Sequence, residues 1–350
     1  MRRRQFTKNF MITSSVLPLY NALANTNLCQ KKIIKPARLH RGDTIGLVAP
    51  GSPLTKKKFR TCIDNLTALG FQLKYDEATV MAQNGYLAGS DTLRLQSLHA
   101  MFADSTVKAI WCLRGGYGTS RLLPDLDFGL VKKNPKVLIG YSDITALNNV
   151  IFQQTGLVTF HGPMGVSDFT AYTTQQLLAV LMQSNEALSI PLSSENQALI
   201  NGKTQPAFFR QTITGGKAIG QLCGGNLSLL VALVGTSYEP DFTNKIIFIE
   251  EIGEKPYRID RMFTQLLQTK TFRKASGIAL GIFEDCQPPS DEPSLSLLAT
   301  LQDRLSGLSI PVAYGFSFGH IANMCTLPIG ISATLDADTF SLTLNESAVL

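Results

Sequence analysis

Ser142 is the residue whose surroundings say most about chemistry, because an apolar strand-like run over 137–139 ends at Gly140 and a helix begins just after it. A serine on a tight strand-to-helix turn projects its oxygen outward, beside the first unpaired N–H groups of the helix, which can hold a developing oxyanion. This pattern predicts an activated hydroxyl. The alternative is that Ser142 or Asp143 caps the helix predicted over 144–154. On local pattern alone the cap is favoured, because Ser and Asp at helix starts far outnumber nucleophiles.

Four histidines are available to supply an imidazole base: His40, His99, His161 and His320. His99 falls inside a predicted helix over 91–103, and His40 precedes the first predicted strand, so both are interpreted as solvated or packing residues. His161 and His320 each lie between apolar runs and glycines, which is typical of a loop brought to a site. Their context alone does not decide between a catalytic and a structural role.

Three carboxylates, Glu250, Glu251 and Glu254, crowd the end of an apolar strand predicted over 245–250. For Glu251 and Glu254 a charged loop rim is the better interpretation. Glu250 directly continues the strand, so it can be held rigidly enough to orient an imidazole. A carboxylate in that role fixes the histidine tautomer and stabilises the imidazolium that forms when a serine gives up its proton.

Metal and nucleotide sites find no support in the spacing of the residues. There is no HExxH motif, and no histidine has a carboxylate or a second histidine at ligand spacing. The glycine-rich runs 114–118 and 214–218 fit neither GxxxxGK[ST] nor a GxGxxG at the head of a βαβ unit. The six cysteines show no CxxC pair, so buried free thiols are expected, with disulfides possible after export. We expect neither a metal nor a cofactor.

The composition predicts a globular chain of two domains, because 350 residues exceed what one core usually holds. Hydrophobic residues make up 44% and charged residues 17%, which is typical of neither a disordered nor a coiled-coil protein. The net charge is +6, but Arg2, Arg3, Arg4 and Lys8 supply four of those charges. The rest of the chain has no basic stripe, so nucleic acid is not expected as a partner.

The N-terminal segment 1–30 is interpreted as an export signal. Its residues 3–8, Arg-Arg-Gln-Phe-Thr-Lys, resemble a twin-arginine pattern, an apolar region follows over 10–23, and 22–24 offers a small-x-small cleavage site. The alternative is an ordinary basic N-terminus of a cytoplasmic enzyme. No run of 18 or more apolar residues occurs, so a stable membrane span is not expected. The signal predicts a periplasmic location.

Strands alternate with helices over 35–168, which predicts a parallel sheet with helices on both faces. In such a sheet ligands bind beyond the carboxyl ends of the strands, where 50–52, 114–118 and Ser142 are all expected. A polar, turn-rich stretch over 169–212 is interpreted as a linker. A second, smaller, β-rich domain is expected over 213–345. There 220–226 is interpreted as opening a helix that runs to Leu233.

Several motifs together resemble the LD-carboxypeptidases, the murein tetrapeptide carboxypeptidases that share a family with microcin-immunity peptidases. The resemblance covers about 36–336, most of the chain beyond the signal. In the first half it rests on 114–118, 140–145 and 161–163, and in the second half on 224–227, 248–251, 257–261, 319–320 and 326–330. Several blocks in the right order are far more specific than any one motif.

The resemblance implies a serine hydrolase in which Ser142 is the nucleophile, His320 the general base and Glu250 its orienting carboxylate. His161 then has no triad role. Backbone N–H groups of Gly116 and Asp143 would form the oxyanion hole, with the choice between Gly115 and Gly116 open. Arg114 is a candidate for contacting a substrate carboxylate, with an internal salt bridge as the alternative.

The same resemblance implies a fold and a reaction. The N-terminal domain would be an α/β domain related to class I glutamine amidotransferases, joined to a smaller β-rich domain, with the site where the two meet and a homodimer as a possible assembly. The expected reaction releases the terminal D-Ala from a murein tetrapeptide through an acyl-enzyme. The alternatives are a microcin-immunity-like peptidase that cleaves peptidyl or aminoacyl-nucleotide amides, and a muropeptide-binding protein without activity. The export signal departs from the many relatives that act in the cytoplasm, and it would change the substrate pool rather than the chemistry.

Overall fold

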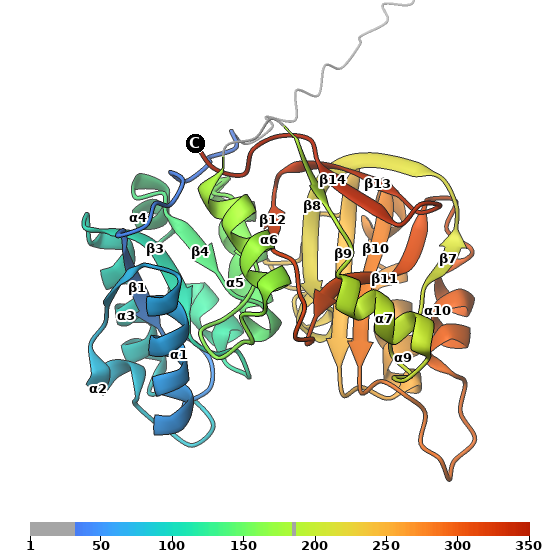
Figure 1. Cartoon of the computed structure of the whole chain (residues 1–350), viewed down its shortest axis with the longest axis horizontal. Coiled ribbons are helices and arrows are strands. Elements are labelled where there is room, and N and C mark those ends of the chain that lie inside the picture. Colours follow the sequence, from blue (N-terminus) through green and yellow to red (C-terminus); the bar gives the residue numbers. More distant parts are fainter. Residues whose placement is uncertain (1–31, 184–186) are drawn as a thin grey trace, which may run out of the picture. The chain divides into compact units, whose positions relative to one another are not determined.

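The computed structural model describes residues 32–183 and 187–350. Residues 32–350 form one compact unit built on two sheets (Figure 1). The predicted export signal and Cys29 lie outside the described residues. Within the described part, no helix is long and apolar enough to cross a membrane.

The first sheet has the strand order β12-β5-β4-β3-β1-β2, and all its neighbours are parallel except β12 and β5. Its strands are β1 (Thr44–Val48), β2 (Gln72–Lys74), β3 (Val107–Cys112), β4 (Val137–Ile139), β5 (Thr159–His161) and β12 (Leu327–Ile329). The chain connects them through α1 (Lys56–Ala68), α2 (Glu77–Val80), α3 (Asp91–Ala103), the 3₁₀ turn η1 (Thr119–Asp125), α4 (Phe128–Lys133), the 3₁₀ turn η2 (Ser142–Ile144) and α5 (Thr145–Thr155). The order 2-1-3-4-5 reverses between β1 and β3, so a ligand site is expected beyond their carboxyl ends.

The second sheet is mixed, in the order β6-β14-β13-β8-β9-β10-β11-β7, and β8 to β11 run parallel to one another. Its strands are β6 (Leu188–Ile190), β7 (Gln211–Thr214), β8 (Lys217–Asn226), β9 (Lys245–Ile252), β10 (Gly277–Glu284), β11 (Val312–Gly319), β13 (Ser332–Asp336) and β14 (Ser341–Leu344). The helices of this half are α8 (Leu227–Ala232), α9 (Pro256–Leu267) and α10 (Leu297–Leu305), with a 3₁₀ turn η3 (Phe272–Lys274). The predicted α/β class, with a mostly parallel first sheet and a mixed second sheet, is confirmed.

Helix α1 illustrates why these residues form their elements. The Thr55 hydroxyl accepts a hydrogen bond from the Lys58 N–H and caps the first turn. Phe59, Cys62 and Leu66 recur at helical spacing and are all buried. The helix ends before Gly70, which adopts a positive φ.

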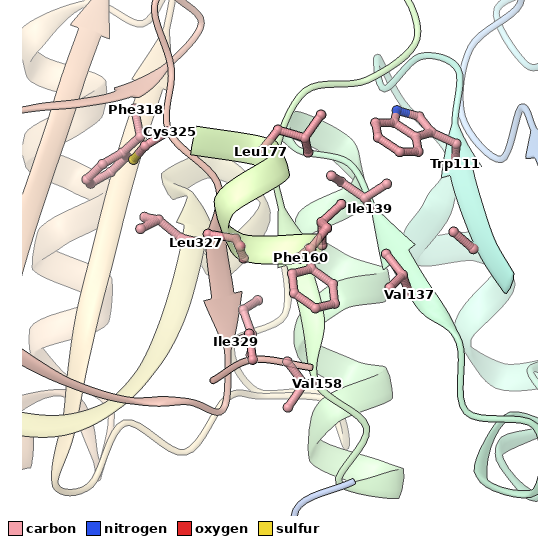
Figure 2. Packing of buried hydrophobic residues seen from close by; sticks show 14 of the residues in the cluster. Trp111, Val137, Ile139, Val158, Phe160, Leu177, Phe318, Cys325, Leu327 and Ile329 are labelled. Carbon is pink, nitrogen blue, oxygen red and sulfur yellow. The ribbon is translucent and has the colours of Figure 1, made fainter. Parts of the chain in front are cut away.

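Strand β12 joins the two halves of the chain, because it follows β11 of the second sheet but pairs with β5 of the first. Leu327 and Ile329 on β12 pack in one cluster with Phe160 of β5, and the cluster continues to Phe318 at the end of β11 (Figure 2). All four side chains are almost fully buried. One hydrophobic core therefore extends from the first sheet into the second.

Two stretches of the second half differ from the expectation. Residues 220–226 belong to strand β8, and the helix begins only at Leu227. The glycines explain the difference, because Gly224 and Gly225 have φ angles of 139° and 135°, and a Cβ on Gly224 would lie 1.9 Å from the Phe248 carbonyl oxygen.

The stretch 169–212, interpreted as a linker, contains α6 (Ala171–Met182), β6 and α7 (Ser194–Gly202). Thr170 and Ser193 cap the two helices, so the polar residues that suggested a linker are partly helix starts. The domain boundaries themselves stay a prediction.

Candidate active site

Ser142 lies on a strained turn between β4 and α5. Its φ is 61°, in the left-handed region that a non-glycine residue rarely adopts. Helix α5 has Ile144 at its N-cap position without a side-chain cap bond, and η2 has none either. The interpretation of Ser142 or Asp143 as a helix cap is therefore wrong.

Asp143 instead holds the neighbouring loop. Its Oδ2 accepts a hydrogen bond from the Thr119 N–H at 3.0 Å, and the Thr119 hydroxyl donates to its carbonyl oxygen. Burial raises the pKa of this carboxyl, against the lowering effect of the hydrogen bond from the Thr119 N–H. The side chain thus fixes the loop after β3 against the Ser142 turn. The oxyanion role of the Asp143 backbone N–H, which the family resemblance implies, stays a prediction.

Two glycines of the loop after β3 lie close to other segments of the site: Gly115 to the Ser142 turn and Gly116 to Ser52. A Cβ on Gly115 would sit 3.1 Å from the Ser142 Cβ and 3.2 Å from the Asp143 nitrogen. Gly116 has a φ of 92°, and a Cβ there would lie 2.3 Å from the Ser52 Oγ. The positive φ and the close approach to Ser52 require glycine at position 116, whereas Gly115 is the glycine whose backbone lies directly beside Ser142. The choice between Gly115 and Gly116 as oxyanion donor stays open.

Arg114 and Arg94 hold the loop after β1 against the loop after β3. The Arg114 guanidinium donates to the Pro53 carbonyl, and no described acidic residue forms an ion pair with it. Arg94 is buried and donates to the carbonyls of Pro50 and Gly118. The sequence analysis assigns no role to Arg94. The signal that could have identified it as a buried residue is its position among the apolar residues of the helix 91–103.

Glu250 and His320 meet at the carboxyl end of the second sheet. Glu250 lies on β9 and is fully buried, and its Oε2 is 2.7 Å from the His320 Nδ1, just beyond β11. Burial alone would lower the pKa of His320, but the charge and hydrogen bond of Glu250 outweigh it and raise that pKa. Burial alone would raise the pKa of Glu250, but His320 lowers it below its usual range. The Glu250 carboxylate thus fixes the tautomer of the His320 imidazole.

The Ser142 turn and the Glu250–His320 pair come from different sheets and lie side by side. The ring of Tyr141, the residue before Ser142, is 4.9 Å from the His320 ring, centroid to centroid. Behind the turn, the Asn149 side chain on α5 donates to the Gly224 carbonyl at 2.8 Å. The Asn226 N–H donates to the Thr145 hydroxyl at 3.0 Å. These bonds hold α5 against β8, so the three predicted triad residues are brought into one region.

His161 lies behind this region, on β5. Its side chain is fully buried beside the rings of Tyr141 and Phe248, and neither ring nitrogen has a hydrogen-bond partner among the described residues. Burial lowers the pKa of His161 to about 4. A neutral, enclosed imidazole of this kind is not placed to exchange protons with solvent.

Glu251 is buried too, which sequence reasoning did not foresee. Its carboxylate accepts hydrogen bonds from the Asn226 amide at 3.0 Å and from the Ser228 N–H and hydroxyl at 2.8 and 2.7 Å. Burial and the neighbouring Glu250 raise the pKa of Glu251. The charged-rim interpretation of Glu251 is wrong, because this side chain ties β9 to the start of α8. Glu254 does pair with Arg258 at the surface.

No group of three or more His, Cys, Asp or Glu side chains in the described ranges could hold a metal ion. The five cysteines in those ranges, Cys62, Cys112, Cys223, Cys286 and Cys325, are free and buried. A serine on a strained strand-to-helix turn, backbone amides beside it and a buried carboxylate–imidazole pair form the arrangement that serine hydrolases use. Fold and site thus define an α/β protein with a serine-hydrolase type of site.

Comparison with known proteins gives the family. Models of the LD-carboxypeptidase N-terminal domain and the LD-carboxypeptidase C-terminal domain match residues 45–162 and 219–335. A Bacillus subtilis protein described as "Probable murein peptide carboxypeptidase" is 42% identical over 302 residues, which cover 86% of this chain and 91% of that relative. The chain belongs to the LD-carboxypeptidase family of serine peptidases and is a hydrolase of that family.

Two solved structures show the same fold. The muramoyltetrapeptide carboxypeptidase of Oxalobacter formigenes is 30% identical with a TM-score of 0.72, and the match covers 86% of this chain and 97% of that one. MccF in complex with glutamyl sulfamoyl guanosine is 26% identical with a TM-score of 0.80, and the match covers 90% and 99%. The chain is thus similar to both branches of the family that the sequence motifs suggested.

Proposed function

We propose that this protein is a serine LD-carboxypeptidase that hydrolyses the amide bond to the terminal D-Ala of murein tetrapeptides. The observation that carries the proposal is the 2.7 Å contact between Glu250 and His320 beside the strained Ser142 turn. Similarity to a murein peptide carboxypeptidase over most of the chain supports the substrate class.

In the proposed reaction the Ser142 Oγ attacks the carbonyl carbon while its proton moves to the His320 Nε2. Backbone N–H groups of Asp143 and of Gly116 or Gly115 hold the oxyanion. The C–N bond then breaks, and His320 gives its proton to the leaving amine of D-Ala. Glu250 keeps its negative charge throughout and stabilises the imidazolium.

Water then hydrolyses the acyl-enzyme, with the same proton transfers in the reverse order. His320 takes a proton from the water as its oxygen attacks the ester carbon, and it returns that proton to the Ser142 Oγ as the ester bond breaks. The tripeptide leaves with a new carboxylate. Arg114 is proposed to contact a substrate carboxylate, because its guanidinium has further N–H donors beyond the one bound to Pro53.

The test is D-Ala release from defined tri-, tetra- and pentapeptide stems, followed by mass spectrometry, with wild type beside Ser142→Ala. We expect release from the tetrapeptide alone and a loss of at least about 10³-fold in Ser142→Ala, since the serine supplies the covalent route. Release by Ser142→Ala at the parental rate would refute the proposal. Binding of the tetrapeptide without turnover by wild type would favour the muropeptide-binding alternative.

A second candidate function is cleavage of peptidyl or aminoacyl-nucleotide amides, favoured by the TM-score of 0.80 to MccF, whose structure holds glutamyl sulfamoyl guanosine. Competition between the murein tetrapeptide and an aminoacyl sulfamoyl nucleoside separates the two functions. We expect kcat/KM to favour the tetrapeptide. A preference for the nucleoside would reverse the assignment.

We also propose export through the twin-arginine route, on the strength of Arg3 and Arg4 followed by an apolar stretch. Replacing both arginines by lysine should leave the full-length protein in the cytoplasmic fraction, with wild type in the periplasm. Equal cytoplasmic amounts of both proteins would contradict this location.

A further inference from the structure

A second acidic side chain, Glu284, lies at the same edge of the second sheet as the site. Strands β9, β10 and β11 are parallel, so their carboxyl ends meet there. Glu250 is on β9, Glu284 ends β10, and His320 follows β11. Glu284 is thus placed beside the candidate site by the sheet itself, although no role for it follows from the proposed reaction.

Glu284 and His320 line a common cavity of about 190 Å³. The other polar side chains of its wall are Asn196 and Gln205 from around α7 and Asn323 from the loop after β11. One water occupies about 30 Å³ in the liquid, so a cavity of this size admits a side chain together with a few waters. The cavity therefore forms a pocket that opens from the predicted general base.

The carboxylate of Glu284 has no partner in this pocket. Its Oε2 is buried without a hydrogen bond, and no Lys or Arg of the described ranges forms an ion pair with it. Burial raises the pKa of Glu284, and the neighbouring Asp285 carboxylate raises it further. Glu284 is half-buried, and because its Oε2 accepts no hydrogen bond from the described residues, a ligand with N–H donors that enters the pocket can pair with it.

We propose that Glu284 binds a substrate ammonium group, carried by the side chain of the residue that supplies the scissile carbonyl. This inference rests on the proposed function and names a specificity residue for it. The D-Ala leaving group brings a carboxylate, which Glu284 would repel, so the acidic pocket fits the acyl side of the bond. A diamino-acid residue there places its ω-amine within one side-chain length of the carbonyl, and a charge-assisted hydrogen bond fixes it.

The experiment compares two tetrapeptides with acetylated amino termini that differ only at this residue, lysine in one and norleucine in the other. Norleucine lacks just the amine, so the pair isolates the cation. For wild type we expect kcat/KM for the lysine peptide to exceed that for the norleucine peptide by about 10- to 100-fold. In Glu284→Gln the ratio should fall close to one, and Glu284→Asp should keep part of it.

The matched control is Glu292→Gln, which removes a carboxylate from a separate surface cavity beside Lys255 and should leave the ratio unchanged. Equal loss on both peptides in Glu284→Gln, or equal rates on both in wild type, would overturn the inference while leaving the carboxypeptidase function intact. Calorimetric binding of both peptides to Ser142→Ala provides a readout without turnover. If wild type cleaves neither peptide, the proposed function fails, and the ratio of the two Kd values still decides whether Glu284 binds the amine.

Discussion

The Glu250–His320 hydrogen bond predicts how the reaction depends on pH. His320 acts as a base only when neutral, and Glu250 holds the pKa of His320 above its ordinary value. We expect kcat/KM to fall about tenfold per pH unit below that raised pKa. In Glu250→Gln, burial dominates and lowers the pKa of His320, so the acidic limb should move to lower pH while the plateau drops by roughly 10³–10⁴-fold. A pH–rate profile with an unmoved limb would contradict the pairing.

His161 predicts a pH dependence of stability instead of activity. Its pKa is about 4 in the folded protein and about 6.5 when unfolded, so the unfolded chain binds more protons between these values. Stability is therefore lost as the pH falls through this window. Relative to His161→Gln, wild type should lose about 2 kcal/mol of unfolding free energy from pH 7 to pH 4.5. Urea titrations at both pH values measure this difference, and effects of His320 cancel because both proteins contain it. Parallel losses in the two proteins would show that His161 does not titrate this way.

The turn between β4 and α5 stores strain at Ser142, and this predicts a stability order among inactive variants. A side chain at a φ of 61° costs about 1 kcal/mol that glycine does not incur. Ser142→Gly should therefore unfold at a higher temperature than Ser142→Ala, although both lack the hydroxyl. Calorimetry of the two proteins makes the comparison. A less stable glycine variant would mean that the surrounding contacts, not the backbone, fix the turn.

The elements show how far sequence patterns reach. The helix over 91–103 matches α3 in both bounds, because its apolar spacing and its Ser90 cap are local signals. The pattern of residues 220–226 indicates a helix start where strand β8 lies, because the close approach of Gly224 to Phe248 is a contact between distant segments. A similar separation in sequence explains why the burial of Glu251 beside Asn226 and Ser228 is not predicted from local pattern. Topology alone places Gly115 and Ser142 at one edge of the sheet. No pattern in the sequence indicates that the Glu284 carboxylate is left without a partner.

Strand β12 couples the two halves of the molecule, since a segment from the second half completes the first sheet. Its partner β5 carries His161 and lies next to β4, which leads to Ser142. Without β12, the edge of β5 and the core around Phe160 would be exposed. We therefore expect neither half to reach its full stability alone, even though separate family models match them.

The shared core predicts a single unfolding transition for residues 32–350. Trp111, the one tryptophan of the chain, is buried in the first sheet, so its fluorescence reports that half. Cys223 and Cys286 are buried in the core cluster of the second sheet, so their alkylation, read by peptide mass spectrometry, reports the other half. Both probes should show the same urea midpoint. Leu327→Ala, on β12, should cost about 2–5 kcal/mol and lower both midpoints together. Had the halves been independent, this substitution would shift the Trp111 signal and leave the two cysteines of the second sheet protected to the wild-type midpoint.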